Sequence, residues 1–288
     1  MIKWYEAFLT RRTQQVRLNS TLSDSLTINI GVPQGCVSSP LLFTLYTNEC
    51  RNYHQNNFII KFSDDTAILS LLMQDSDISG YQEEIDRVVR WCESNKLVLN
   101  ATKTKEIIFD PKSIGNHTVV TLNGEAVEQV ATFKYLGILF DSDLKWGQQV
   151  EFLCSRISQR LHFLRRLRVF GIDKDIMMAF HRASIESIIR YGITVWFGNL
   201  SVKLKAQLQT LIKRAGKIMG MPPPTSLQVL FDESVMRQGQ TIAEDQEHIL
   251  HGEYELLPSG RRYRLPNCKT NRFKFSVVPW SIRLLNSR

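Results

Sequence analysis

Two adjacent carboxylates, Asp64 and Asp65, interrupt an otherwise apolar segment, NNFIIKFSDDTAILSLL, at residues 56–72. A carboxylate buried without a partner is costly, so acids in such a setting require a turn, a partner or a metal ion. Residues 58–62 and 66–71 have the character of strands, which predicts a hairpin turn at the two acids. Carboxylate oxygens exposed in a turn are suited to Mg²⁺ and to phosphoryl transfer. Asp-Asp is also ordinary turn chemistry, so both interpretations remain open for the dipeptide alone.

The segments on either side of this turn must position the two acids. The stretch GVPQGCVSSP, which begins at Gly31, predicts a loop, and the apolar residues 41–46 after it predict a buried helix. Residues 81–94 predict an amphipathic helix because their apolar side chains recur at helical spacing. The side chains on that face are Ile85, Val88, Val89 and Cys92.

Further short elements are expected in the first half of the chain. Residues 2–12 have the pattern of a helix end, and residues 14–18 and 26–30 alternate like strands joined by a polar turn at 19–25. KLVLN and KEIIFD predict short strands split by residues 101–105. A hairpin is predicted at 118–130 through Asn123 and Gly124, and TFKYLGILFDSDLKW supplies another strand and turn. Residues 1–148 therefore have an α+β pattern.

The character of the sequence changes to helix from residue 149 onward. An apolar stripe runs along the first helix, with three arginines, Arg156, Arg160 and Arg165, lying off it. The stripe consists of Leu153, Ile157, Leu161, Leu164 and Leu167. Residues 176–191 and 202–219 repeat the helical pattern, and GMPPPTS at 220–226 breaks it. We therefore expect a basic helical region at 149–220 and a basic, partly extended tail at 221–288.

The positive charge of the chain is concentrated in this second half. The formal net charge is +8, but residues 156–217 hold thirteen Lys and Arg against three Asp and Glu. Residues 256–288 add eight basic residues and no acidic one. A nucleic-acid backbone is the commonest partner of such a cationic face, and the alternative is a solvated helix surface.

The five cysteines are odd in number and scattered, which favours a reducing, intracellular setting, nuclear or cytoplasmic. The first residues, MIKWYEAFLTRR, lack the pattern of a signal peptide, and no apolar run is long enough to cross a membrane.

Four motifs, in order, carry a resemblance to a known family. They are GVPQGCVSSPLLFTLYTN, KFSDDTAIL, WCESNKLVLNATKTKEIIF and FKYLGILFDSDLKW. Together they resemble successive motifs of the reverse transcriptases of LINE-type (non-LTR) retrotransposons, and RLHFLRRLR and ELLPSGRRYRLP resemble the region downstream. The resemblance implies an α+β fold: a partial right-hand polymerase palm at 1–148, an α-helical thumb-like region at 149–220 and a C-terminal basic tail at 221–288.

The resemblance also assigns roles to residues of the first half. Pro33, Gln34 and Gly35 match the loop that lies against template and incoming nucleotide, with Gly31 and Gly35 allowing close backbone approach. Phe62-Ser63-Asp64-Asp65 matches the family's aromatic-Ala-Asp-Asp box. Asp64 is then the expected ligand of catalytic Mg²⁺, of which the intact family enzyme uses two ions, and Asp65 is the second, less direct carboxylate.

Three further groups receive roles in the same way. Lys103 would place a cation near the triphosphate to assist the leaving group, although a solvated lysine is an open alternative. Tyr135, Leu136 and Gly137 match the turn that grips the primer end. Arg156, Arg160 and Arg165 would track the phosphates of an RNA–DNA or DNA duplex. The implied partners are an RNA template, that duplex and deoxynucleoside triphosphates.

The sequence departs from the family pattern in two respects. Ser63 stands where the family usually has Ala, a small change that we expect to be tolerated. The first catalytic Asp of the family lies upstream of the PQG loop, and before Gly31 this chain has only Glu6 and Asp24 as acids. We therefore expect a C-terminal part of a retrotransposon polyprotein, an RNA-directed DNA polymerase fragment that is incomplete and inactive alone. The alternatives are a catalytically incompetent nucleic-acid-binding remnant and an unstable relic.

Overall fold

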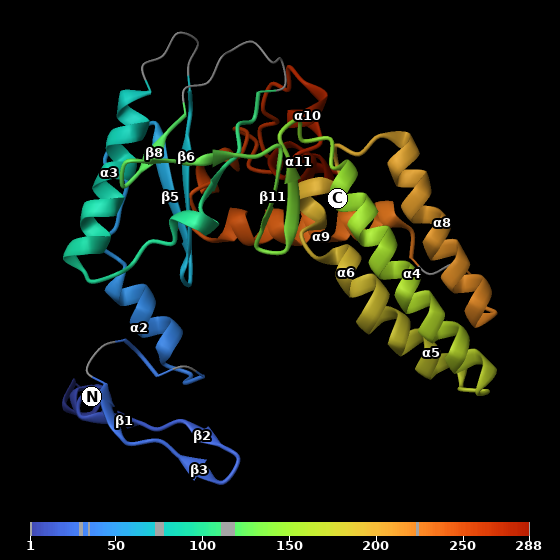
Figure 1. The fold of residues 1–288 in the computed structure, drawn as a ribbon. Coiled ribbons are helices and arrows are strands. Elements are labelled where there is room, and N and C mark those ends of the chain that lie inside the picture. The colour runs from blue at the N-terminus through green and yellow to red at the C-terminus, as the bar shows by residue number, and fades with distance from the viewer. Residues whose placement is uncertain are drawn as a thin grey trace. The chain divides into compact units, whose positions relative to one another are not determined.

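The computed structural model, which describes residues 2–28, 31–33, 35–72, 78–110, 119–222 and 225–287, contains both helices and strands (Figure 1). The predicted α+β class is confirmed. The chain divides into two compact units. The first unit comprises Met1–Thr104 with Gly115–Glu128, and the second comprises Lys105–Ile114 with Gln129–Arg288.

The first unit begins with a helix and a long two-stranded ribbon. The elements are α1 (Ile2–Leu9), β1 (Arg12–Gln14), β2 (Arg17–Leu18), β3 (Thr21–Leu22) and β4 (Leu26–Ile28). β1 pairs with β4 and β2 with β3, both antiparallel. The chain reverses inside the predicted polar turn at 19–25, but the turn is shorter than predicted, because β2 and β3 pair directly on either side of Asn19 and Ser20. Asn19 has a φ of 55°, a left-handed conformation that Asn tolerates well, so a tight turn forms there and β3 occupies part of the predicted turn.

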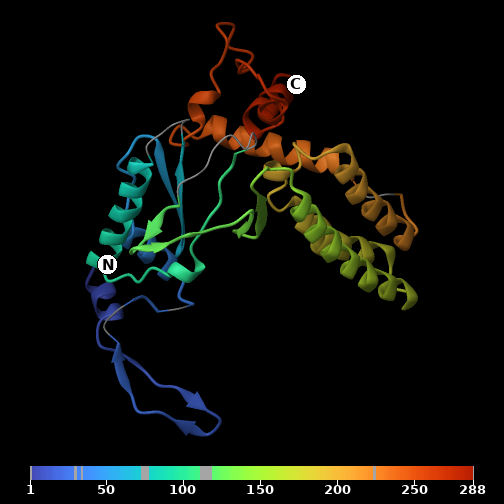
Figure 2. The same cartoon turned by 45° about the horizontal axis from the view of Figure 1, so that its top comes forward.

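The predicted helix and hairpin form in the middle of this unit, but the helix is not buried as predicted, because Leu41, Leu45 and Tyr46 are 57%, 62% and 49% exposed. These elements are α2 (Ser39–Tyr46), β5 (Asn57–Phe62) and β6 (Asp65–Ser70). β5 and β6 pair antiparallel from Asn57 opposite Ser70 to Phe62 opposite Asp65. α3 (Ser79–Ser94) lies beside this hairpin (Figures 1 and 2).

α3 supplies the core of the first unit through the face that the sequence predicts. Ile85 and Val89 are buried in one cluster, and Val88 and Cys92 are buried in another. The first cluster also holds Val120, Leu122 and Val127, from and beside β8 (Thr121–Leu122) and β9 (Glu125–Ala126). Asn123 and Gly124 form the predicted turn between these two strands, with φ of 54° and 80°.

The predicted strand KLVLN at residues 96–100 is wrong. Lys96 has a φ of 54°, and the backbone N–H of Leu97 donates to the carbonyl of Cys92 at 2.8 Å. A left-handed residue followed by a hydrogen bond to the carbonyl five residues earlier is a C-terminal capping arrangement of a helix. α3 therefore ends at this cap, and a 3₁₀ turn at Ala101–Lys103 follows.

The second unit opens with strands and continues with helices. β7 (Lys105–Glu106) lies in it, β10 (Glu128–Gln129) lies at its boundary, and β11 (Thr132–Tyr135) pairs antiparallel with β12 (Ile138–Asp141). The helices are α4 (Gly147–Val169), α5 (Lys174–His181), α6 (Ser187–Arg190), α7 (Ile193–Trp196), α8 (Val202–Met219), α9 (Leu227–Glu244), α10 (Asn271–Lys274) and α11 (Val277–Asn286). A π-helical turn, Arg182–Glu186, joins α5 to α6, so the single helix predicted at 176–191 contains a widened turn.

One large hydrophobic cluster holds the helices of the second unit together. α4 buries Leu153, Ile157, Leu161 and Leu164, four of the five residues of the predicted stripe, and Leu167 packs partly buried beside them. α4 packs along α8, and α9 packs on α11 (Figure 1). Leu230 and Phe231 of α9 belong to the same cluster. The region predicted as a partly extended tail is therefore helical at 227–244, where it completes this core.

The segment between α9 and α11 contains the irregular backbone that the sequence predicts for the tail. Leu256 and Tyr263 form an isolated antiparallel bridge. The buried hydroxyls of Tyr254 and Ser281 lie 2.6 Å apart, which links this segment to α11. In the part of the chain that the structure describes, no helix is both long and apolar enough to span a membrane.

Candidate active site and nucleic-acid surface

The two aspartates lie where the β5–β6 hairpin turns. Phe62 pairs with Asp65, so Ser63 and Asp64 are the two central residues of the turn and Asp65 begins β6. Both carboxylates are exposed. An apolar strand pair thus carries two acids without burying either, because both are solvated at its tip.

Ser63 adopts the unusual backbone conformation of this turn. Its φ is 56°, whereas Asp64 keeps an ordinary negative φ. Positive φ at the first central residue alone is the pattern of a type II′ hairpin turn, which favours Gly at that place. A small side chain here tolerates the conformation at some cost in strain.

Lys61 fixes β5 to the end of α2. Its Nζ donates to the carbonyl of Thr47, the C-terminal capping residue of α2, and to that of Cys50 at 2.9 Å. The last carbonyls of a helix lack partners within the helix, and a cation there satisfies them. Sequence reasoning missed Lys61. The signal was its place on the same strand face as Asn57 and Ile59, which the hairpin turns inward.

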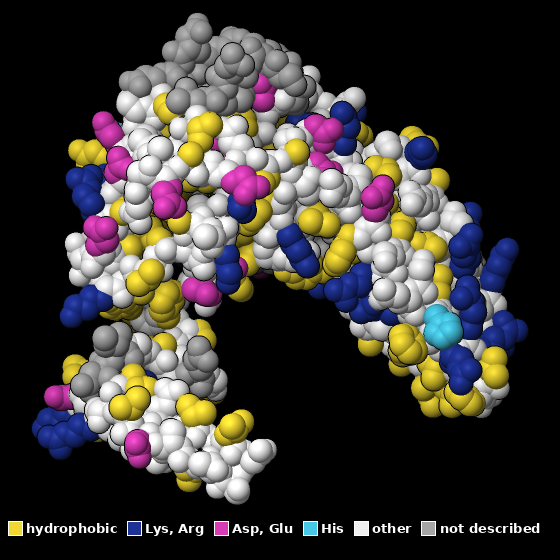
Figure 3. Space-filling model, in the orientation of Figure 1, with side chains coloured by type: hydrophobic (Ala, Val, Ile, Leu, Met, Phe, Trp, Pro, Cys, Tyr) yellow, Lys and Arg dark blue, Asp and Glu magenta, His cyan; other side chains and the backbone are white. Residues whose placement is uncertain are grey.

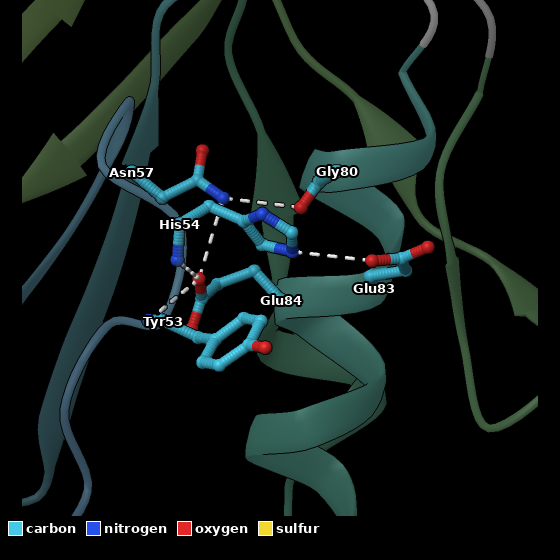
Figure 4. Close-up of polar contacts among 6 residues, drawn as sticks. All are labelled: Tyr53, His54, Asn57, Gly80, Glu83 and Glu84. Carbon is cyan, nitrogen blue, oxygen red and sulfur yellow. Dashed lines mark hydrogen bonds and ion pairs between the residues drawn. The ribbon is translucent and has the colours of Figure 1, made fainter.

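A buried carboxylate, Glu84, anchors the other end of β5 (Figure 4). The side chain of Glu84 is fully buried, and its oxygens accept from the backbone N–H of Tyr53 and of His54 at 3.0 Å each. Asn57 Nδ2 donates to Glu84 Oε2 at 3.4 Å and to the carbonyl of Gly80 at 3.1 Å. The first two turns of α3 therefore hold both β5 and the chain that leads into it.

The pKa of Glu84 reflects these bonds. Burial raises the pKa of this carboxyl, but hydrogen bonds from the backbone of His54 and Tyr53 and from the side chain of Asn57 outweigh burial and leave the pKa below its ordinary value. Glu84 is thus a charged, fully bonded structural anchor. Sequence reasoning did not identify it, because it is one of several acids at the start of α3.

The PQG loop has the backbone conformations that its glycines predict. Gly31 and Gly35 have φ of 74° and 80°, and a Cβ added at either would meet no atom within 4 Å. Glycine is therefore required at these positions for conformation and not for lack of space. Arg12 Nη2 donates to the carbonyl of Gly31 at 2.6 Å, and Ser39 Oγ donates to the carbonyl of Pro33. Gln34 lies outside the described residues.

Lys103 lies at the end of the 3₁₀ turn after α3. Its backbone N–H donates to Asn100 Oδ1 at 3.1 Å, which makes Asn100 the cap of that turn, and the side chain of Lys103 is exposed. The loop, the hairpin tip and Lys103 all belong to the first unit. Tyr135, Leu136 and Gly137 and the three arginines belong to the second.

The acids at the hairpin tip suit a hard metal ion whose remaining ligands are phosphate oxygens of a substrate. Among the described residues, no three His, Cys, Asp or Glu side chains gather as a metal site. Mg²⁺ characteristically uses one or two carboxylates, keeps several waters and takes its remaining ligands from substrate phosphates. Asp64 and Asp65, exposed and adjacent, can supply the carboxylate share of such a site.

The predicted primer-grip turn is a tight turn of the β11–β12 hairpin. Tyr135 pairs with Ile138, and Leu136 and Gly137 occupy the turn with φ of 45° and 83°. Tyr191 Oη donates to the carbonyl of Leu136 at 2.6 Å, and a Cβ added at Gly137 would lie 3.2 Å from the Tyr191 ring. Gly137 thus serves the turn and also admits the tyrosine that braces it, a residue that sequence reasoning missed.

The arginines of α4 lie on its outward face. Arg156 and Arg165 are exposed and Arg160 is partly exposed. No carboxylate pairs with any of the three within the described part of the chain, whereas Arg190 is held by Glu186 at 2.7 Å and Glu233 at 2.8 Å. Arg156 lies over the Phe152 ring, with 5.2 Å from Cζ to the ring centroid. Figure 3 shows Lys and Arg side chains gathered over α4, α5 and α8.

Comparisons with known proteins give two family-model matches to parts of this chain. Residues 1–140 match the family model described as reverse transcriptase (RNA-dependent DNA polymerase). Residues 157–187 match a second one, described as the N-terminal part of alkylated DNA repair protein alkB homolog 8. No solved structure shows a significant match.

Curated relatives extend the first match toward the C-terminus. The chain is 30% identical over 202 residues to the probable RNA-directed DNA polymerase from transposon BS of Drosophila melanogaster. The matched region covers 66% of this chain and 22% of that protein. The chain is also 30% identical over 156 residues to the polymerase from mobile element jockey of the same species, covering 50% and 17%. For the jockey polymerase of Drosophila funebris the identity is 26% over 231 residues, covering 75% and 25%.

The chain spans about a quarter or less of the length of these relatives. Within that span the predicted resemblance is confirmed. Residues 1–140 carry the reverse-transcriptase pattern, and the chain is a member of the family of RNA-directed DNA polymerases encoded by non-LTR mobile elements.

Proposed function

We propose that this chain is the part of an RNA-directed DNA polymerase that carries the second half of a polymerase palm and a thumb-like helical region. The observation that carries the proposal is the exposed pair Asp64 and Asp65 at a two-residue hairpin turn, in a segment that matches the reverse-transcriptase family. The division into palm at 1–148, thumb-like region at 149–220 and basic tail at 221–288 belongs to the same proposal.

In this proposal the residues of the first unit bind and orient the reactants. Asp64 and Asp65 would hold Mg²⁺, which supplies charge stabilisation to the transferring phosphoryl group when bound. Pro33, Gln34 and Gly35 would face template and nucleotide. Lys103 would place its ammonium near the triphosphate, where a cation stabilises the charge that develops on the leaving group.

The residues of the second unit would position the growing duplex. The braced turn at Leu136 and Gly137 presents backbone at a tight reversal, which suits contact with the primer end. The cations of α4 would contact phosphates, a contact that depends on charge and spacing but not on base sequence.

The test of catalysis is primer extension on an RNA template with Mg²⁺. We expect little synthesis by the 288-residue chain alone, because a partner carboxylate from a neighbouring strand is needed to fix the metals, and a shortfall of about 4 kcal/mol in the transition state reduces the rate roughly a thousandfold. The role of Asp64 is tested in a chain that is longer at its N-terminus, where Asp64→Ala should abolish primer extension and leave duplex binding intact.

Asp86→Ala, which removes a carboxylate from the outer face of α3, is the matched control. Robust Asp64-dependent extension by the short chain would contradict the inactivity; equal loss of folding and activity would assign Asp64 a structural role.

A second candidate function, nucleic-acid binding without catalysis, is favoured by the unpaired arginines of α4. If about six phosphates are neutralised, the affinity for an RNA–DNA hybrid should fall with salt at a log–log slope of roughly −5. Changing Arg156, Arg160 and Arg165 together to Glu should weaken binding strongly and flatten the slope. The control changes three exposed cations of the first unit, Lys3, Arg11 and Arg17, to Glu. A flat salt response of the parent chain, or equal effects of the two triple changes, would contradict this surface.

A further inference from the structure

A small cavity in the second unit lies between the starts of α8 and α9 and the α10–α11 segment. Its volume is about 290 Å³. Side chains of three kinds line it, two of opposite charge, one neutral amide and three aromatic rings. They are Lys205, Gln228, Asp232, Phe231, Phe275 and Trp280. None of these residues has a role in the proposed polymerase chemistry.

Three rings form the apolar walls of the cavity. Trp280 lies 5.3 Å from Phe275 and 6.5 Å from Phe231, measured between ring centroids, and both pairs are tilted. Phe231 is almost fully buried, whereas Phe275 and Trp280 are partly exposed. Partly exposed rings at the wall of a cavity are surfaces on which a planar group can stack.

Asp232 presents a carboxylate with spare acceptor capacity. Its Oδ1 accepts from Trp280 Nε1 and from Gln228 Nε2, each at 2.8 Å. These two bonds hold the side chain in place. Within the described residues its second oxygen, Oδ2, accepts no hydrogen bond, so this oxygen remains available to a donor in the cavity.

Lys205 presents an ammonium group with spare donors. Its Nζ lies 4.6 Å from the centroid of the Phe197 ring, and within the described residues it forms neither an ion pair nor a hydrogen bond. Burial lowers the pKa of Lys205, and the nearby charge of Asp232 opposes this effect. Lys205 and Asp232 line the same cavity but form no salt bridge within the described residues, so neither charge is neutralised by the other in a direct pair.

The charges of this cavity restrict its ligand. A phosphate would be attracted by Lys205 and repelled by Asp232. A cation would be attracted by Asp232 and repelled by Lys205. A neutral planar group with donors on one edge and acceptors on another satisfies both residues and the ring walls. Guanine has N1–H and N2–H₂ as donors and O6 and N7 as acceptors, and lysine to O6 or N7 of guanine is a common specific contact.

We propose that this cavity binds an unpaired guanine base of RNA, with Asp232 accepting from its amino edge and Lys205 donating to its carbonyl edge. The choice of RNA as the source of the base rests on the proposed function. The recognition itself rests on the donor and acceptor pattern of the cavity.

The experiment measures binding of guanosine, xanthosine and uridine monophosphates to the full chain by saturation-transfer NMR. Xanthine carries a carbonyl where guanine has its amino group. We expect the parent chain to bind guanosine monophosphate about tenfold more tightly than xanthosine monophosphate. Asp232→Asn, whose amide can donate where the carboxylate accepts, should reverse the preference toward the xanthosine form. A merely structural role of Asp232 cannot produce this reversal.

Two matched variants control for charge and folding. Glu244→Gln removes an exposed carboxylate from the same helix, α9, and should leave the guanosine preference unchanged. Lys205→Met should weaken guanosine binding about tenfold, whereas Lys203→Met, on the exposed face of α8, should not. Equal binding of all three nucleotides by the parent chain, or a preference that survives Asp232→Asn, would overturn the proposal.

The source of the base is tested separately with single-stranded RNA. The experiment compares the binding of two RNA strands to the parent chain, a nine-nucleotide oligouridine and the same strand with one central guanine. Binding of both strands without guanine preference would contradict the cavity and leave the proposed function intact. Discrimination among mononucleotides without binding of either strand would contradict RNA as the partner and leave the cavity assignment intact. A preference for peptide amides over all nucleotides would assign the cavity to a protein partner and overturn the proposal.

Discussion

The two units of this protein bury their apolar side chains to different degrees. In the second unit Leu164, Ile189 and Trp196 are completely buried within one cluster. In the first unit Phe58, Ile60 and Phe62 on the outer face of β5 remain 49%, 47% and 62% exposed. A two-stranded hairpin is only marginally stable by itself. The candidate carboxylates therefore lie on the weakly supported unit, and the candidate phosphate-binding cations lie on the well-packed one.

This difference assigns different tasks to the polar residues of each unit. Lys61 and Glu84 hold the β5–β6 hairpin through hydrogen bonds to backbone, because packing supplies little. In the second unit Arg156, Arg160 and Arg165 of α4 form no ion pair with a carboxylate among the described residues, and the hydrophobic core that holds α4 positions them instead. Changes to the core should thus affect the second unit most, and changes to polar anchors should affect the first.

The largest expected effect is truncation in the core of the second unit. Trp196→Ala should lower the free energy of unfolding of that unit by about 3–5 kcal/mol, because it removes a completely buried ring and leaves a cavity. Its neighbour Val195, which is 42% exposed, provides the control, and Val195→Ala should cost less than about 1 kcal/mol. Denaturant unfolding followed by circular dichroism measures both. Similar losses for the two variants would contradict the assignment of the core.

The second effect is loss of the buried anchor of the first unit. Glu84→Gln should destabilise that unit by about 1–3 kcal/mol, because a neutral amide leaves one of the backbone N–H groups of Tyr53 or His54 without its charged acceptor. Glu83→Gln, which changes the exposed neighbour that faces His54, should have a small effect. Amide hydrogen exchange of β5 compares the two variants.

The same residue predicts an acid dependence of the first unit. The folded-state pKa of Glu84 lies below its ordinary value, so its stabilisation is complete above that ordinary value and is lost as pH falls through the depressed one. Protection of β5 should therefore decline below about pH 4 in the parent chain, and Glu84→Gln should reduce this decline. A decline of the same size in Glu84→Gln would exclude Glu84 as its source.

The third effect concerns a buried polar side chain in the core of the second unit that lacks hydrogen-bond partners among the described residues. His181 is almost fully buried, and within the described residues neither ring nitrogen has a hydrogen-bond partner. Burial lowers the pKa of His181, so the folded chain holds it neutral. Stability from this group is present above the ordinary pKa of about 6.5 and falls as pH decreases toward the depressed value.

His181→Leu should consequently stabilise the second unit by about 1–2 kcal/mol near pH 6, because it removes unsatisfied buried polar atoms. It should also remove the decline in stability below about pH 6.5. Thermal unfolding at several pH values measures both effects, and His162→Leu on the exposed face of α4 is the control. Destabilisation by His181→Leu at every pH would show that the imidazole makes contacts a leucine cannot replace.

α4 and α8 of the second unit could be predicted from sequence because burial follows helical periodicity there. Leu153, Ile157, Leu161 and Leu164 repeat at the spacing of one helix face, and that face is buried. The cap after α3 could not be predicted in this way. Residues 96–100 alternate like a strand, and the left-handed Lys96 that ends the helix has no distinctive residue type.

The candidate site could be predicted only where residue type alone is informative. Asp64, Gly31 and Gly35 can be placed in turns because acids between apolar strands and closely spaced glycines predict chain reversals. Lys61 and Glu84 are charged residues that look like surface positions, although Glu84 precedes Val88 and Cys92 at helical spacing and so falls on the buried face of α3. Their partners are backbone atoms of distant segments, which no local pattern specifies.

The smallest expected change in stability concerns the open face of the hairpin. Phe58 and Leu69 are cross-strand partners, and they are 49% and 45% exposed. Changing both to Thr should alter the free energy of unfolding by less than about 1 kcal/mol, since Thr keeps β-propensity and little burial is lost. It should nevertheless reduce self-association, because exposed apolar faces of sheets bind one another.

The cross-strand pair on the opposite face gives the matched control. Ile59 and Ile68 are partners in the same hairpin, but both pack against the residues of α3. Changing these two to Thr should destabilise the first unit and increase self-association, because the hairpin would separate from α3. Analytical ultracentrifugation across a concentration series separates the two outcomes. If both double changes lowered association equally, the open face would not be its cause, and the contrast between the units would have to rest on their cores alone.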